Sequence, residues 1–127
     1  MAYLFDSNVL IYHLNGELNT PGKALLKAGL LGNGAYSIIS KIEVLGFQQP
    51  TAVEIQARQL FSNLTEIPLT SEIAEQTIAL RKLYKIKLPD AIIAATAMIQ
   101  TLQLITRNSS DFARITGLLI LNPFEAS

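Results

Sequence analysis

The chain has 127 residues, half of them hydrophobic, which is enough for one compact domain with its own core. Ten Lys and Arg balance ten Asp and Glu, which excludes net charge as an argument for attraction to nucleic acid or membranes, so any anionic partner must be held locally. The absence of cysteine excludes disulfides, thiolate metal sites and a cysteine nucleophile.

Short apolar runs alternate with helical patterns from the start of the chain. Residues 2–5 form the first predicted strand, and Ser7-Asn8 can cap a short helix that ends at Asn15-Gly16. Pro21 suits the first turn of a second helix. After a glycine-rich turn, residues 35–39 form the second predicted strand.

The middle of the chain continues this alternation. Ser40 is the predicted cap of a third helix, and Pro50 breaks the chain before a fourth, in which apolar residues recur at helical spacing over residues 53–64. Residues 66–69 form a short predicted strand, and residues 70–84 form a helix.

The last third of the chain opens with an uncharged, apolar helix. Pro89 sets its first turn, and its length is too short for a membrane span, so we expect a buried helix from Asp90. Two further strands, over residues 102–106 and 118–121, flank a short helix over residues 109–115.

The fold class follows from this alternation. Strands separated by helices predict an α/β protein, a three-layer α/β/α sandwich with a central, mainly parallel sheet. A single domain is expected over residues 1–127. The N-terminus lacks a basic segment, and no uncharged window reaches about 18 strongly apolar residues. We therefore expect no membrane association and a cytoplasmic location.

Four carboxylates lie in or beside apolar segments, where we expect them to be buried or half-buried: Asp6, Glu43, Asp90 and Asp111. A lone buried carboxylate costs several kcal/mol unless it is paired or binds a metal. The basic residues are not placed as obvious partners for all four. A shared cation is the economical explanation.

The positions of the acids relative to the predicted strands support a shared site. Asp6 and Asp111 follow strands, Glu43 lies one turn into the helix after the second strand, and Asp90 is in the first turn of its helix. Ligands of such sheets collect beyond the carboxyl ends of the strands. Because all these ligands are oxygens, Mg²⁺ or Mn²⁺ suits them better than zinc.

At these acids the chain resembles the PIN-domain ribonucleases, and most of all the toxin subunits of VapBC toxin-antitoxin systems. The resemblance spans essentially the whole chain, because the motifs run in the family's order from residue 5 to residue 112. The motifs are Phe5-Asp6-Ser7-Asn8-Val9-Leu10, Ser40-Lys41-Ile42-Glu43, Leu88-Pro89-Asp90-Ala91-Ile92-Ile93-Ala94-Ala95-Thr96-Ala97 and Ile105-Thr106-Arg107-Asn108-Ser109-Ser110-Asp111-Phe112.

The resemblance implies which residues form the metal site and perform catalysis. Asp6, Glu43 and Asp90 match the three most characteristic acidic positions of the family. Family members place the fourth acid at the position of Asn108 or at that of Asp111, and we assign Asp111 here. The supporting polar residues are Ser7, Asn8, Thr106 and Asn108.

The chemistry implied is hydrolysis of RNA. One or two Mg²⁺ or Mn²⁺ ions can activate a water, neutralise the phosphoryl oxygens and stabilise the leaving alkoxide. We predict an endoribonuclease that uses a metal-activated water and acts as the toxin of a type II toxin-antitoxin pair. If water attacks and the 2′-hydroxyl is not used, the products carry 5′-phosphate and 3′-hydroxyl ends.

Each acid also has a purely structural interpretation. Asp6 can cap the first helix, and Glu43 can face solvent. Asp90 can be a first-turn residue that the helix dipole favours, and Asp111 can belong to an ordinary helix start. A non-toxin or catalytically degenerate PIN domain, acting in RNA processing or as an RNA- or protein-binding module, is the alternative function. A phosphate-accepting receiver domain fits less well, because no acid follows the third strand at Leu69.

The expected partners come from the resemblance and from composition. Toxins of this kind form homodimers and are neutralised by a small antitoxin protein whose C-terminal segment covers the active site. The apolar helices over residues 21–31 and 53–64 offer surface for such contacts. Basic residues beside the motifs are secondary candidates for RNA phosphates, or for an ordinary solvated face: Lys41, Lys85, Lys87, Arg107 and Arg114.

Overall fold

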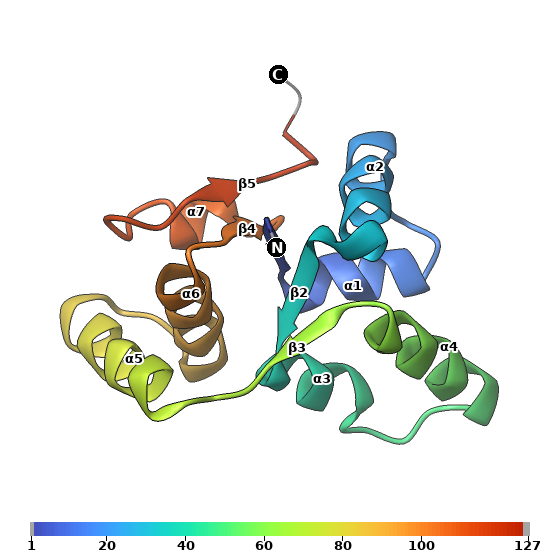
Figure 1. Ribbon diagram of the computed structural model, residues 1–127, viewed down its shortest axis with the longest axis horizontal. Helices are drawn as coiled ribbons and strands as arrows, with labels where there is room; N and C mark the ends of the chain where they lie inside the picture. The colour runs from blue at the N-terminus through green and yellow to red at the C-terminus, as the bar shows by residue number, and fades with distance from the viewer. Residues whose placement is uncertain (1, 126–127) are drawn as a thin grey trace.

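The computed structural model describes residues 2–125, which form a sheet covered by helices (Figure 1). Its strands are β1 (Tyr3–Phe5), β2 (Gly34–Ser37), β3 (Thr65–Ile67), β4 (Gln103–Ile105) and β5 (Ile120–Leu121). The helices are α1 (Ser7–Leu14), α2 (Thr20–Ala28), α3 (Ile38–Leu45), α4 (Thr51–Ser62), α5 (Ser71–Leu83), α6 (Leu88–Gln100) and α7 (Ser109–Phe112), and a π-helical turn, η1 (Gly29–Asn33), follows α2.

The five strands form one sheet in the order β3-β2-β1-β4-β5, and each neighbouring pair is parallel. From the central strand β1 the chain continues to β2 and β3 on one side, and β4 and β5 lie on the other side of β1. The strand order therefore reverses between β1 and β4, which is where open α/β sheets usually bind their ligands.

Successive residues of β1 and β2 pack into two different hydrophobic cores, one on each face of the sheet. Leu4 and Ala35 belong to the core that includes residues of α5 and α6, whereas their neighbours Phe5 and Tyr36 belong to the core formed with α1, α2 and α4. Figure 1 shows α5 and α6 on one side of the sheet and α1, α2 and α4 on the other. The predicted three-layer α/β/α fold is confirmed, and the sheet is wholly parallel.

The uncharged helix predicted near Asp90 is α6, and it begins two residues earlier, at Leu88, with Pro89 in its first turn. Residues 91–97 of α6 are all buried. A helix that is apolar on every side is usually an internal one. No helix within residues 2–125 has the length and hydrophobicity needed to cross a membrane. That residues 1–127 form a single domain stays a prediction.

Two predicted boundaries are wrong for identifiable reasons. β2 ends at Ser37, and α3 starts at Ile38, although two adjacent isoleucines favour a strand locally. The cap is Ser37, whose Oγ accepts a hydrogen bond from the Ile39 N–H at 3.2 Å, and Ser40 instead lies buried inside α3. β3 ends before Pro68, which has no N–H to donate to a neighbouring strand.

The remaining boundaries differ by a few residues. α2 ends at Ala28, earlier than predicted, and the chain reaches β2 through η1, where Gly32 has φ +118°. α7 and β5 are shorter than predicted, and Gly117 lies between them with φ +88°. Both glycines adopt a left-handed conformation that other residues rarely adopt.

Candidate active site

The four predicted acids line a single pocket of about 250 Å³. Asp6 directly follows β1, Glu43 lies on α3, Asp90 lies in the first turn of α6, and Asp111 lies on α7 after β4. The structure therefore brings together acids that are up to 105 positions apart in the sequence. The other residues that line the pocket are Ser7, Asn8, Lys87, Pro89 and Asn108.

Asp6 is the buried centre of this pocket, with 3% of its surface exposed. It occupies the N-cap position of α1, yet its side chain makes no capping hydrogen bond. Instead Oδ2 accepts a hydrogen bond from the Thr106 hydroxyl at 2.7 Å. Thr106 is fully buried, and its Oγ1 accepts from the Asn108 N–H at 3.0 Å. The capping interpretation of Asp6, and the prediction that Ser7-Asn8 provides the cap, are both wrong.

The charge on Asp6 is unfavourable in this position. Burial raises the pKa of the Asp6 carboxyl to about 6, and the charges of Asp90 and Glu43 act in the same direction. The Thr106 hydroxyl and the Ser7 N–H lower this pKa, but do not compensate for burial. Near neutral pH a nearby cation would therefore stabilise the negative charge of the Asp6 carboxylate.

Glu43 belongs to an exposed part of the pocket, contrary to the expectation that it is buried or half-buried. The short helix α3 presents it to solvent, while Val44 takes the core position. Its Oε1 accepts a hydrogen bond from the Ser7 hydroxyl at 2.7 Å. Ser7 Oγ is also hydrogen-bonded to Ser40 Oγ at 2.8 Å. Two buried hydroxyls therefore form a hydrogen-bonded chain that ends at the Glu43 carboxylate.

Asp111 is also exposed rather than buried, because α7 is a four-residue helix that places only Phe112 in the core. The Asn108 amide donates to Asp111 Oδ2 at 2.9 Å. Asn108 and Asp111 therefore form one hydrogen-bonded pair on the rim of the pocket. In the sequence these two residues occupy the alternative positions of the family's fourth acid.

Asp90 is half-buried, as expected, and is surrounded by the other acids. Burial raises the pKa of the Asp90 carboxyl, and the charges of Glu43 and Asp111 add to this effect. Lys87 lines the same pocket and acts in the opposite direction on that pKa. The pocket thus has one cationic side chain against four carboxylates.

Comparison with known proteins agrees with this geometry. The sequence model of the PIN domain family matches residues 3–118. The chain is 36% identical over 114 residues to Ribonuclease VapC10 of Mycobacterium tuberculosis, a match that covers 86% of this chain and 84% of that protein. This chain belongs to the PIN domain family.

Solved structures support the same assignment. This PIN domain is 39% identical to a chain of a toxin-antitoxin complex from Klebsiella pneumoniae, with a TM-score of 0.81 and coverage of 98% of this chain and 100% of that chain. A chain of DNA-bound VapBC from Salmonella typhimurium has a TM-score of 0.84 at 20% identity, covering 97% of this chain and 98% of that chain. At that identity the second likeness concerns the fold alone.

The donor set of this PIN domain fits a divalent cation. Its four carboxylates supply hard oxygen ligands, and their mutual repulsion is a cost that a cation would remove. Within residues 2–125, however, no three His, Cys, Asp or Glu side chains are arranged to hold a metal ion as they stand. The exposed carboxylates of Glu43 and Asp111 are hydrogen-bonded to Ser7 and Asn108.

The five basic residues suggested for binding RNA phosphates differ in their contacts. Lys41 pairs with Glu66 at 3.1 Å, and Arg114 donates to the carbonyls of Asp111 and Lys85. Lys87 lines the acidic pocket. Arg107 instead lies against two aromatic rings.

Ser40 is the polar residue of the site whose role the sequence analysis missed. The sequence predicts Ser40 as a helix cap, but its hydroxyl is hydrogen-bonded to the Ser7 hydroxyl, which in turn donates to Glu43. The sequence did contain a signal. Ser40 precedes Glu43 by three residues, and this spacing places two side chains on the same face of a helix.

Proposed function

We propose that this PIN domain is a metal-dependent endoribonuclease and the toxin of a type II toxin-antitoxin pair. The observation that carries the proposal is the convergence of Asp6, Glu43, Asp90 and Asp111 on one pocket, in a chain 36% identical to a named ribonuclease. The 39% identity to a chain of a toxin-antitoxin complex supports the toxin role. A degenerate PIN domain is less consistent with a complete set of acids.

The carboxylates would hold Mg²⁺ or Mn²⁺. When bound, such an ion supplies a water of lowered pKa and neutralises charge on the phosphoryl oxygens. The chain itself positions the ligands. Thr106 fixes Asp6 Oδ2 by its hydroxyl, Ser7 holds Glu43, and Asn108 holds Asp111. Such supporting hydrogen bonds orient metal ligands and typically change affinity or activity 10- to 100-fold.

Two further groups contribute to the reaction. The ammonium of Lys87, in the wall of the same pocket, offers positive charge to a phosphate that enters it. Asp6, with its pKa raised to about 6, carries a proton for part of the time in slightly acidic solution and releases it when a cation binds. Metal affinity should therefore fall below about pH 6.

The partner proposed is a small antitoxin protein. Exposed apolar side chains on the two helical segments suggested for interfaces include Leu31 after α2, and Val53 and Ile55 on α4. These side chains suit contacts with an apolar partner surface. The homodimer, the RNA substrate and the cytoplasmic location stay predictions.

Cleavage of a mixed cellular RNA pool, with Mn²⁺ or Mg²⁺, tests the proposed function. The purified chain is compared with Asp90→Asn, after both are checked for folding by circular dichroism. Glu75→Gln is the matched control, because it neutralises an exposed carboxylate on α5 that does not line the pocket. Discrete metal-dependent fragments should appear with the wild type and Glu75→Gln and be lost with Asp90→Asn.

The other outcomes contradict the proposal in different ways. Equal fragments from all three proteins would indicate a contaminating nuclease. RNA binding without cleavage by the wild type would indicate a binding module instead of an enzyme.

A further inference from the structure

Arg107 packs against two aromatic side chains that are distant in sequence. Its Cζ lies 5.1 Å from the centre of the Tyr12 ring and 4.6 Å from the centre of the Phe124 ring. The two rings also contact each other, with centres 5.4 Å apart and planes at 57°. Contact with aromatic faces stabilises a guanidinium in one position while it keeps its charge.

The segment that carries Phe124 is fixed to the rest of the molecule by hydrogen bonds. The Asn19 amide donates to the Pro123 carbonyl at 2.7 Å, and the Asn122 amide donates to the Arg107 carbonyl at 2.9 Å. The Phe124 N–H donates to Asn122 Oδ1 at 2.8 Å. The ring is therefore placed by a defined backbone path that also contacts the loop of Arg107.

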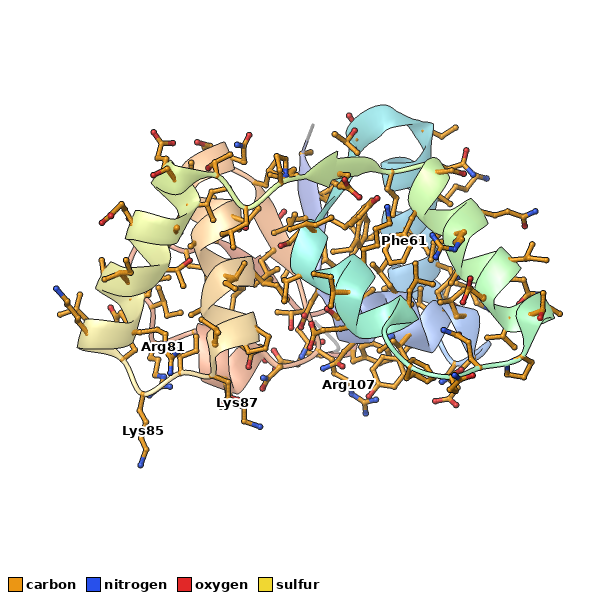
Figure 2. The ribbon with its side chains drawn as sticks, turned by 90° about the horizontal axis from the view of Figure 1, so that it is seen from below. Phe61, Arg81, Lys85, Lys87 and Arg107 are labelled. Carbon is orange, nitrogen blue, oxygen red and sulfur yellow. The ribbon has the colours of Figure 1, made fainter. Side chains whose placement is uncertain are left out.

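Arg107 stands next to the acidic pocket. Its neighbour Thr106 bonds Asp6, and its other neighbour Asn108 lines the pocket. Figure 2 shows the side chains of Arg107, Lys87 and Lys85 along one edge of the molecule. Because Lys87 lines the acidic pocket, this edge borders the pocket.

We propose that Arg107 binds the RNA phosphate adjacent to the scissile one, and that Tyr12 and Phe124 position its guanidinium for that contact. The proposal rests on the proposed function and adds a substrate-binding residue to it. Its Cζ lies over both rings, and among residues 2–125 no hydrogen bond engages its guanidinium N–H groups, so these donors remain to bind two oxygens of one phosphate. Arg107 is exposed, and no carboxylate in residues 2–125 pairs with it.

The other basic residues are less suited to this role. Lys41 is already paired with Glu66, and Arg114 uses its donors on backbone carbonyls. A fixed guanidinium also loses less side-chain entropy on binding than a free lysine does. Arg107 is therefore the cation beside the acidic pocket that is best prepared to hold a phosphate.

The test is binding of a short, labelled single-stranded RNA of mixed sequence, followed by anisotropy over a series of salt concentrations with Mn²⁺ present. The proteins carry Asp90→Asn so that the RNA stays intact. Arg107→Ala should weaken binding about tenfold and reduce the slope of log affinity against log salt by about 0.7, the value for one phosphate contact on a single strand. Arg58→Ala, which removes an exposed arginine from α4 outside the pocket, should change neither quantity.

Two further variants separate charge from position. Arg107→Lys should keep most of the salt slope but lose part of the affinity, because the charge remains without the planar contact. Phe124→Leu should weaken binding a few-fold with the slope unchanged, because only the placement of Arg107 is altered. In the cleavage assay with Asp90 restored, Arg107→Ala should raise KM about tenfold and leave kcat nearly unchanged.

Several results would overturn the proposal. One is an unchanged salt slope and affinity in folded Arg107→Ala, with RNA binding by the parent protein intact. Another is a lower kcat at unchanged KM, which would indicate that Arg107 only supports the pocket. A variant that binds RNA normally but fails to bind its antitoxin would indicate a protein contact instead. Absence of RNA binding by the parent protein would contradict the proposed function as well.

Discussion

The two halves of the acidic pocket differ in how firmly the fold holds them. The inner half is the Asp6–Thr106 pair, placed by the carboxyl ends of β1 and β4 and almost completely buried. The outer half consists of Glu43 and Asp111, exposed on short helices and tied by single hydrogen bonds to Ser7 and Asn108. Asp90, half-buried in α6, lies between these extremes.

The contrast in burial explains how several like charges can share a pocket in a folded protein. A single carboxylate is buried at a site that the sheet defines, and it keeps a raised pKa. The others remain in contact with water, where their repulsion is weaker because the dielectric constant is high. We propose that the inner acid marks the position of a bound cation and that the exposed outer acids turn towards it.

The greatest loss of activity is expected from substitution of the inner acid, and a much smaller loss from substitution of an outer acid. Asp6→Asn keeps the size of the side chain and an acceptor for Thr106, but removes the fixed negative charge. We expect kcat/KM to fall about 1,000-fold, because several kcal/mol of transition-state stabilisation depend on the ion. Asp111→Asn should lower it only about tenfold, because that acid is exposed and adaptable. Equal losses on the same RNA would remove the distinction between the halves.

The second effect concerns stability without metal. Because the pKa of Asp6 is raised from 3.8 to about 6 on folding, the native state binds a proton more tightly than the unfolded chain does. The resulting stabilisation is present in full below about pH 4 and is lost as the pH rises to about 6, a change of about 3 kcal/mol. Urea unfolding with a chelator present should show this decrease.

Asp6→Asn is the control for that titration. Its stability should change far less between about pH 4 and about pH 6, and it should be the more stable protein at neutral pH. A wild type that becomes more stable over this interval would show that Asp6 is not the dominant titrating group.

A third effect depends on the hydrogen bond within the inner half. Thr106→Val preserves shape but leaves the buried Asp6 without the hydroxyl donor, and we expect a loss of about 1–3 kcal/mol in the free energy of unfolding. Activity should fall about 10- to 100-fold. Thr106→Ser, which keeps the hydroxyl, should recover most of the activity, and failure to do so would assign the effect to packing.

The smallest effect should come from the outer half. Asn108→Ala removes the donor to Asp111 at the pocket rim, and the free energy of unfolding should change by no more than about 0.5 kcal/mol. Cleavage should fall at most about tenfold. A loss as large as that of Thr106→Val would mean that Asn108 is itself a ligand or substrate contact.

The nature of the reaction is open to a separate test. Hydrolysis by water leaves fragments with 5′-phosphate and 3′-hydroxyl ends, which a 5′-phosphate-dependent exonuclease degrades. Fragments that end in a 2′,3′-cyclic phosphate would instead show that the RNA 2′-hydroxyl is the nucleophile.

Much of the fold was predictable because its signals are local. The apolar runs that precede Asp6 and Thr106 defined the strands of the inner site, and Pro89 marked the start of α6. The family resemblance rested on four motifs in a fixed order, and the match of the PIN domain family model to residues 3–118 confirms it. The boundary of β2 was mispredicted because Ile38 and Ile39 suit either a strand or a buried helix face.

Other features of the site depend on tertiary contacts. An apolar neighbour such as Ile42 suggested that Glu43 was buried, but Ile42 is itself 58% exposed. The hydrogen bond from Thr106 to Asp6 joins residues 100 positions apart. The contact of Arg107 with Tyr12 and Phe124 joins three separate segments, so no spacing in the sequence indicates it.

We propose that the four acids bind a divalent cation together. Mn²⁺ binding, measured by electron paramagnetic resonance at neutral pH, tests it most directly for the wild type and the amide variants of Asp6, Glu43, Asp90 and Asp111. We expect the wild type to bind Mn²⁺, with at least about tenfold weaker affinity in every variant and the greatest loss in Asp6→Asn. No binding by the folded wild type, or equal affinity in all five proteins, would contradict it.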